Sequence, residues 1–322
     1  MGVYEWLLEP ADPSVRYRTL VELMDLGASE EAKNAKKLIS ESEPVKTLTA
    51  KMHPDGYWLQ KDYKGRIVGD SVEYGSFATT HFCLAYCAEL GLDRSQPFIE
   101  KAASRYLGLQ KEDGDWWDHL SCLFGYNIRT FIMLGFRDDE RVMKAIDLML
   151  KTNRPDGGYL CDMHEKEKGR PPKSCVRGAV KALLAFSELP EYWNHKRCLQ
   201  LVEYFLSRNG IYKRNDQKQF VSKDMLTDSF PIIWRTNVWE ILYALSKMGY
   251  GNDERLADAW KVMESRRDTN GRYLLNWTPS QSPWQAGIRG EPNKWITLYC
   301  TLAEKYRDST KRSARNMDER CE

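Results

Sequence analysis

One phrase recurs along this chain of 322 residues and constrains its fold more than any other feature. The two clearest copies are IMLGFRDDERVMKAIDLMLKTNRPDGGYL and SKMGYGNDERLADAWKVMESRRDTNGRYL. Two marking glycines are 22 residues apart in each of these copies and 23 apart in a third. The pairs are Gly135 and Gly157, Gly249 and Gly271, and Gly91 and Gly114. A fixed period of this length is typical of folds built from repeated supersecondary units.

Each unit reads as two helices. In the second half of one copy, Val142, Ile146 and Met149 recur at three- and four-residue steps, which predicts one apolar helix face. The glycine after each first helix is a natural C-cap, and Asp138 or Asp253 suits the N-cap of the second helix. Because the turn between the two helices is short, we expect them to be antiparallel.

The number of helices predicts a closed ring. The sequence indicates six first helices and five second helices, since the helix from Lys294 to Arg307 has no second half. Closure would bury both ends, whereas the alternative, an open superhelix, would expose them. The helices that line the ring should start near Ser14, Ser71, Ser121, Ser174, Ile232 and Pro292. We therefore predict an all-α protein, an α/α toroid of about six helical hairpins with the last incomplete. It comprises one domain over residues 1–308 and a polar tail over 309–322.

The aromatic loops of the repeats carry a resemblance. DGYW, DGDWW, DGGY and NGRY resemble the repeats of squalene and oxidosqualene cyclases and of protein prenyltransferase β subunits. CLFGYN, SCVRGAVKALLAFSELP and GEPNKWITL are similar to segments of a functionally uncharacterised group of single-domain members of this terpenoid cyclase and prenyltransferase superfamily. The resemblance implies the α/α toroid and leaves the reaction open.

Charge and hydropathy exclude some partners. Lysine plus arginine is 48 and aspartate plus glutamate is 46, a net charge of +2 that creates no long-range field for nucleic acid. No apolar run reaches the roughly 18 residues that a membrane helix needs. The start, MGVYEWLLEPADP, lacks the pattern of a signal peptide, so we expect a cytoplasmic protein whose eight cysteines are thiols. The oligomeric state is not indicated.

Functional residues should gather at one mouth of the ring. The inner helices all run in one direction, so their N-termini and the loops that precede them converge there. These loops, over residues 53–72, 111–121, 155–174, 210–231 and 270–293, are much longer than the opposite turns. Long loops on a rigid scaffold usually carry function, and converging helix N-termini favour an anion.

A zinc site is predicted at this mouth. Cys122 and Cys175 open two inner helices, and Cys161 and His164 lie in the loop between them. Thiolate and imidazole are the ligands of tetrahedral zinc, although the spacing matches no known finger motif. An unligated thiol cluster and a redox pair are the alternatives.

The resemblance bears on this site as well. Prenyltransferase β subunits hold a catalytic zinc with an Asp, a Cys and a His, and Cys122 is similar in position to that Cys. Leu120 stands where the family has Asp, and Cys175 where it has His. A closed, structural zinc is therefore expected in place of a catalytic one.

A ligand pocket is predicted just inside the mouth. We expect four basic side chains around it, two tryptophans as its walls, and an amide and two carboxylates beside them. These residues are Arg129, Arg177, Arg235 and Lys294; Trp234 and Trp295; and Asn237, Asp118 and Asp228. An anionic head with a hydrocarbon tail, such as a prenyl diphosphate, would fit this set. The alternative is that the arginines are neutralised by Asp118, Asp224 and Asp228 and that the lumen is packed.

Three functions stay open, and the sequence does not decide whether the protein is an enzyme. The first is binding or transforming an isoprenoid-like small molecule in the lumen. The second is a non-enzymatic partner-binding module with a structural zinc, and the third is a glycan-processing toroid, which needs paired carboxylates. An aromatic lumen would favour the first, a plugged lumen the second, and acids with exposed rings the third. The acidic run at Asp138 is a repeat turn, which disfavours cyclase chemistry by protonation.

Overall fold

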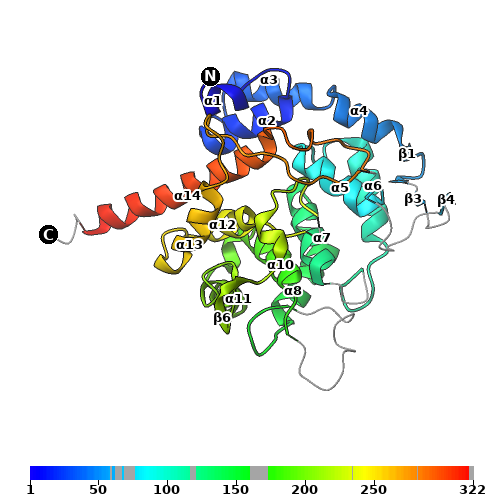
Figure 1. The fold of residues 1–322 in the computed structure, drawn as a ribbon. Helices are drawn as coiled ribbons and strands as arrows, with labels where there is room; N and C mark the ends of the chain where they lie inside the picture. The colour runs from blue at the N-terminus through cyan, green and yellow to red at the C-terminus, as the bar shows by residue number, and fades with distance from the viewer. Residues whose placement is uncertain are drawn as a thin grey trace.

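Inner helices surround a common axis in the computed structural model (Figure 1). The structure describes residues 1–58, 60–61, 67–68, 77–116, 121–159, 173–233, 235–280 and 282–318. The inner helices are α2 (Pro13–Arg18) with its continuation η1 (Thr19–Leu23), α5 (Thr80–Glu89), α7 (Ser121–Met133), α10 (Val176–Ser187), α12 (Val238–Lys247) and α14 (Lys294–Asp318). All ten residues of α5 are buried, as expected for a helix enclosed between two layers.

The outer helices bury one face only. They are α3 (Glu30–Ile39), α4 (Glu43–Ala50), α6 (Pro97–Leu107), α8 (Glu140–Lys151), α11 (Lys196–Leu206) and α13 (Ala257–Glu264). In α8 the buried residues include Val142, Ile146 and Met149, so the predicted apolar face is confirmed. Gly135 adopts the left-handed conformation at the end of α7, and Asp139 caps α8, one residue later than predicted. The chain is thus a series of helical hairpins.

The last inner helix closes the ring against the first. Arg18 Nη1 donates a hydrogen bond to the Tyr299 hydroxyl at 3.0 Å, and Lys305 Nζ donates to the carbonyl oxygen of Glu22 at 2.7 Å. Figure 1 accordingly shows α14 beside α2. The α/α toroid is confirmed, and the open superhelix is excluded by these contacts.

Short strands and short helices lie in the loops that connect the helices of the ring. β1 (Met52–His53) pairs with β2 (Tyr57–Trp58), β3 (Gln60–Lys61) with β4 (Ile67–Val68), and β5 (Tyr212–Lys213) with β6 (Asp216–Phe220), all antiparallel. The short helices are α1 (Val3–Leu7), η2 (Pro190–Tyr192), η3 (Lys223–Leu226) and η4 (Glu254–Leu256). Trp58 is buried and donates from Nε1 to the Leu48 carbonyl at 2.8 Å, so it ties its loop to an outer helix.

Some helix boundaries differ from the prediction. α12 begins at Val238 because Asn237 and Glu240 form a capping box there, six residues after the predicted start. α5 begins at Thr80, and the predicted start at Ser71 lies outside the described residues. α14 continues to Asp318, so part of the predicted tail is helical.

Two inner helices pack in unusually close contact. A Cβ atom at Gly125 of α7 would lie 2.6 Å from the backbone of Lys181 and Ala182 in α10. Only glycine allows this approach. The same contact fixes how α10 presents Lys181 to the interior.

Within the described ranges, no helix has both the length and the apolar character required to cross a bilayer.

Candidate functional site

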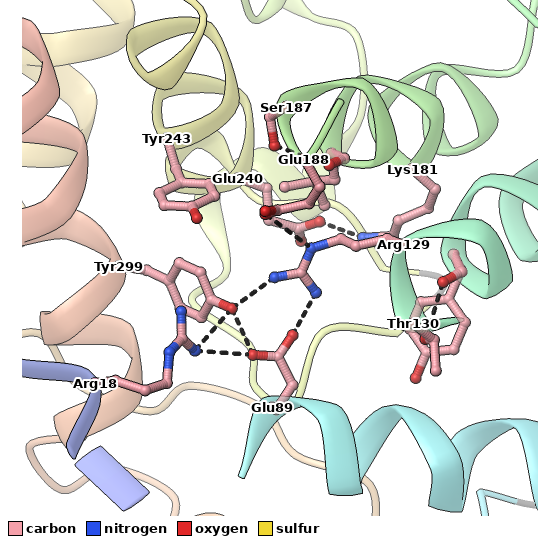
Figure 2. Close-up of polar contacts among 12 residues, drawn as sticks. Arg18, Glu89, Arg129, Thr130, Lys181, Ser187, Glu188, Glu240, Tyr243 and Tyr299 are labelled. Carbon is pink, nitrogen blue, oxygen red and sulfur yellow. Dashed lines mark hydrogen bonds and ion pairs between the residues drawn. The ribbon is translucent and has the colours of Figure 1, made fainter. Parts of the chain in front are cut away.

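A network of ion pairs occupies the middle of the lumen (Figure 2). The Glu89 carboxylate accepts hydrogen bonds from Arg18 Nη1 at 3.1 Å, from Arg129 Nη1 at 2.5 Å and from the Tyr299 hydroxyl. Arg129 Nη2 also donates to the Tyr299 oxygen at 2.8 Å. These four residues, the central network, come from α2, α5, α7 and α14, and the charged side chains are at most 5% exposed. Four inner helices are therefore joined at one point.

The central network keeps Glu89 ionised in a buried position. Burial alone would raise the pKa of Glu89, but Arg129, Arg18 and the Tyr299 hydroxyl outweigh it and hold the pKa below its usual range. Burial raises the pKa of Tyr299, which stays a hydrogen-bond donor. The central network therefore joins four inner helices through hydrogen bonds between ionised arginines, an ionised carboxylate and a protonated tyrosine.

A second buried ion pair joins α10 to α12. Lys181 pairs with Glu240, and their side chains are 1% and 0% exposed. Lys181 Nζ also donates to the Arg235 carbonyl at 2.6 Å. Burial lowers the pKa of Lys181 and raises that of Glu240, so both shift toward their neutral forms. Asn237, a predicted pocket residue, binds Glu240 as the helix cap and so has a structural role.

Aromatic rings fill the lumen between the central network and the mouth. Trp295 stacks on Phe230 with centroids 5.3 Å apart, and Trp284 meets Trp295 edge-on at 5.3 Å. Trp239 stacks on Tyr299 at 5.1 Å. These rings contact one another. Trp284 and Trp295 also line a cavity of about 530 Å³ beside the N-terminus of α2, together with Asp12, Ser14 and Glu41.

A cavity of about 420 Å³ lies at the opposite end, where the inner helices stop. Its lining combines three acids, three bases and three tyrosines with a few apolar residues, and we name it the polar cavity. The polar lining residues are Glu22, Asp93 and Glu188; Arg18, Lys36 and Lys247; and Tyr17, Tyr243 and Tyr306. Arg18 belongs both to this wall and to the central network.

Two acids of the polar cavity, Glu188 and Asp93, are paired with lysines and ionised. Lys247 Nζ lies 2.6 Å from Glu188, and Lys36 Nζ lies 2.8 Å from Asp93. Burial opposes ionisation of Glu188, but Lys247 and Arg129 outweigh it, so its pKa falls below the usual range. The pKa of Asp93 is lowered in the same way by Lys36 against the effect of burial. The cavity thus presents fixed, balanced charges at its wall.

The four predicted basic residues do not form one set at the mouth. Arg177 and Arg235 come together, since both pair with Asp224, at 2.8 and 3.0 Å. Arg129 lies deep in the lumen with Glu89. Lys294 pairs with Glu9 at 2.8 Å. The structure thus brings together two of the four predicted cations, and each of the four lies beside an acid.

The remaining predicted pocket residues divide into two groups. Asp228 accepts from Arg266 Nε at 2.8 Å, and burial raises its pKa despite that partner. Its carbonyl accepts from the backbone of Asn276, so it ties two loops together. Trp295 is packed as described above. Trp234 and Asp118 lie outside the described residues.

Two of the four predicted zinc ligands are described. Cys122 lies in the first turn of α7, Cys175 caps α10, and both are thiols. Burial, with a smaller contribution from Cys175, raises the pKa of Cys122 to about 11. Cys161 and His164 lie outside the described residues, and no cluster of three or more metal-binding side chains occurs among those described. The zinc site stays a prediction.

Three charged residues that organise the interior are absent from the predicted site. Glu89, Glu188 and Lys247 each stand two residues before the glycine or proline that stops an inner helix. This repeated position is visible in the sequence and could have identified them.

Comparison with known proteins identifies the architecture. No protein-family profile and no curated protein sequence matches the chain. A glycosyl hydrolase of family 88 from Bacteroides vulgatus is similar in structure with a TM-score of 0.52 and 12% identity, over 95% of this chain and 99% of that one. A polysaccharide lyase has a TM-score of 0.50 and 12% identity, over 94% and 90%. The fold is an α/α toroid. At this identity the likeness concerns the fold alone.

A terpene cyclase also aligns with this toroid. The type II enzyme MstE from Scytonema has a TM-score of 0.33 and 12% identity, over 86% of this chain and 99% of that one. That likeness is too weak to support an argument, and the resemblance to terpenoid cyclases continues to rest on the repeat motifs.

Proposed function

We propose that this toroid binds a neutral saccharide in the polar cavity. The observation that carries the proposal is the lining: three acids, three bases and three tyrosines around about 420 Å³ at one end of the ring. That volume lies within the usual range of small-molecule sites, roughly 300–1,000 Å³. Acids with partly exposed rings are the lining expected of a glycan site.

The chemistry of the lining suits a polyhydroxylated ligand. Sugar hydroxyls can donate to the Glu188 carboxylate and accept from Lys247, and such hydrogen bonds to charged groups contribute about 1.5–3 kcal/mol each. Tyr17 and Tyr306 are half-buried and offer ring faces for the C–H faces of a sugar. Because the three acids and three bases balance, the cavity favours a ligand without net charge.

A prenyl diphosphate is less well supported. The inner helices end at the polar cavity, so their partial negative charges point toward it and oppose a multiply charged anion. Trp295, one of the two tryptophans expected to hold the hydrocarbon tail, packs on Phe230 and Trp284. The family 88 hydrolase and the polysaccharide lyase are by name glycan-acting proteins on this fold, which agrees with the saccharide proposal.

The proposal is binding and not hydrolysis. Glycoside hydrolysis needs one carboxyl group that stays protonated to act as the acid. The pKa values of Glu188 and Asp93 are instead held below their usual range. These two acids can therefore accept hydrogen bonds but cannot supply a proton at neutral pH.

Thermal-shift and calorimetric titration test the proposal. The ligands are neutral mono- and disaccharides, glucuronate, glucosamine and farnesyl diphosphate. A ligand at one hundred times its dissociation constant should stabilise the fold by about 2.7 kcal/mol. We expect the neutral saccharides to bind most tightly.

Glu188→Gln should weaken saccharide binding, because it removes a charged acceptor from the cavity wall. Glu191→Gln is the matched control, since Glu191 pairs with Arg137 on the surface and lies outside the lining. The proposal fails if no neutral saccharide stabilises the protein, or if both variants bind as the wild type does.

The second candidate function is a partner-binding module with a structural zinc. It is supported by the central network and the aromatic packing, which plug the middle of the lumen. The zinc would be held by Cys122, Cys161, His164 and Cys175. In that case the polar cavity would bind none of the small molecules above, and the metal would be needed for stability.

A further inference from the structure

One repeat position supplies the wall of the polar cavity from three consecutive hairpins. In each hairpin a lining side chain stands two residues before the glycine or proline that stops the inner helix. The pairs are Met133 and Gly135, Glu188 and Pro190, and Lys247 and Gly249. The equivalent residue of the second hairpin, Glu89, joins the central network directly beneath. In each of these four hairpins, the side chain at this repeat position therefore lies at the same end of the lumen.

In the first hairpin, a residue at a different position lines the polar cavity. By the same spacing from Gly27, the cavity residue would be Asp25, but its side chain is 79% exposed and pairs with Lys305. The π-helix η1 lies just before it, and Glu22 from η1 lines the cavity instead. A π-helix widens one turn and so changes which side chain faces inward, and such turns are frequent at functional sites.

Met133 differs from the other members of this position. Glu188 and Lys247 are charged and paired with each other, and Arg129 Nε lies 3.9 Å from Glu188. Met133, on the neighbouring helix α7, is half-buried and uncharged. One charge placed at residue 133 would therefore turn a balanced lining into one with a net charge.

We infer that this repeat position is the ligand-contact position of the toroid, and that the uncharged Met133 makes the cavity select neutral over charged saccharides. The inference rests on the proposed function, because it names what decides which saccharide the same cavity binds. A sugar in the cavity packs its C–H face on the thioether of Met133 and directs hydroxyl groups to Glu188 and Lys247.

Charge substitution at this residue tests the inference. Met133→Lys should raise the affinity for glucuronate relative to glucose about tenfold, equivalent to 1.4 kcal/mol. Met133→Glu should raise the affinity for glucosamine relative to glucose by a similar factor. Met143→Lys and Met143→Glu are the matched controls, because Met143 is 43% exposed on the outer helix α8 and each changes the net charge equally. The controls should leave both ratios unchanged.

Each outcome separates the two proposals. Should the wild type bind glucose or another neutral saccharide while folded Met133 variants keep the wild-type ratios, the inference is refuted and the proposed function stands. Should the wild type bind no saccharide, the proposed function fails and the inference with it. If both Met133 variants lose the fold by circular dichroism, Lys247→Gln gives the cavity the same net negative charge. A ratio of glucosamine affinity to glucose affinity above that of the wild type then supports the inference, and an unchanged ratio refutes it.

Discussion

Removing the carboxylate of Glu89 is the most direct test of the central network. Glu89→Gln keeps the volume of the side chain but leaves Arg18 and Arg129 without the anion that they share. Breaking a buried ion pair from one side costs about 3–5 kcal/mol. Both arginines keep a second acid, Glu22 at 2.5 Å and Glu188 at 3.9 Å, so we expect the lower end, about 3 kcal/mol.

The assay is urea unfolding followed by circular dichroism, with thermal melting as a second measure. A loss of about 3 kcal/mol corresponds to a fall in Tm of roughly 4–5 °C, because the entropy of unfolding is about 2.1 cal/mol/K per residue and the chain has 322 residues. Glu191→Gln is the control, since this carboxylate is 43% exposed and pairs with Arg137, and exposed pairs contribute about 0–1 kcal/mol. A Glu89→Gln protein no less stable than Glu191→Gln would refute the reasoning.

Three further outcomes are expected. Since the pKa of Glu89 is below its ordinary value of 4.5 in the folded protein, the stabilisation is present above that pH and is lost as the pH falls through the lower, folded pKa. Wild-type urea midpoints should therefore fall more steeply than those of Glu89→Gln as the pH is lowered below about 4.5. Lys181→Met should destabilise by about 3–5 kcal/mol because it leaves Glu240 buried without a cation, and adding Glu240→Gln should restore most of the loss in the same unfolding assay. Zinc should co-purify near one atom per chain by elemental analysis, and Cys175→Ser should remove it; metal-free protein with unchanged stability would exclude the site.

The repeat made the ring predictable. Glycines at a constant spacing mark where each inner helix stops, and the apolar face of α8 follows from local periodicity. The pairing of Arg235 with Asp224 was also foreseen, because the two residues are eleven apart in one loop. Such features depend on neighbours in the chain, which a single sequence displays.

The interior chemistry was not predictable in the same way. Glu89 meets Arg129 and Tyr299 across 40 and 210 residues, and nothing local in the sequence selects these partners. Arg129 was placed at the mouth because its helix starts there, yet two turns of helix carry it to the opposite half of the lumen. The π-helix η1 places Glu22, and not Asp25, in the cavity wall, and no sequence pattern predicts a π-helix there.

Ring closure also dictates when the protein can finish folding. Arg18 and Tyr299 are separated by 281 residues. At a synthesis rate of about 5–20 residues per second, the first helix waits roughly 15–60 s for its partner to leave the ribosome. Until then the nascent chain is an arc with two apolar ends, and its arginine must remain hydrated. A solenoid could be shortened by whole repeats and stay folded, whereas a cut ahead of residue 294 leaves this arc unable to close.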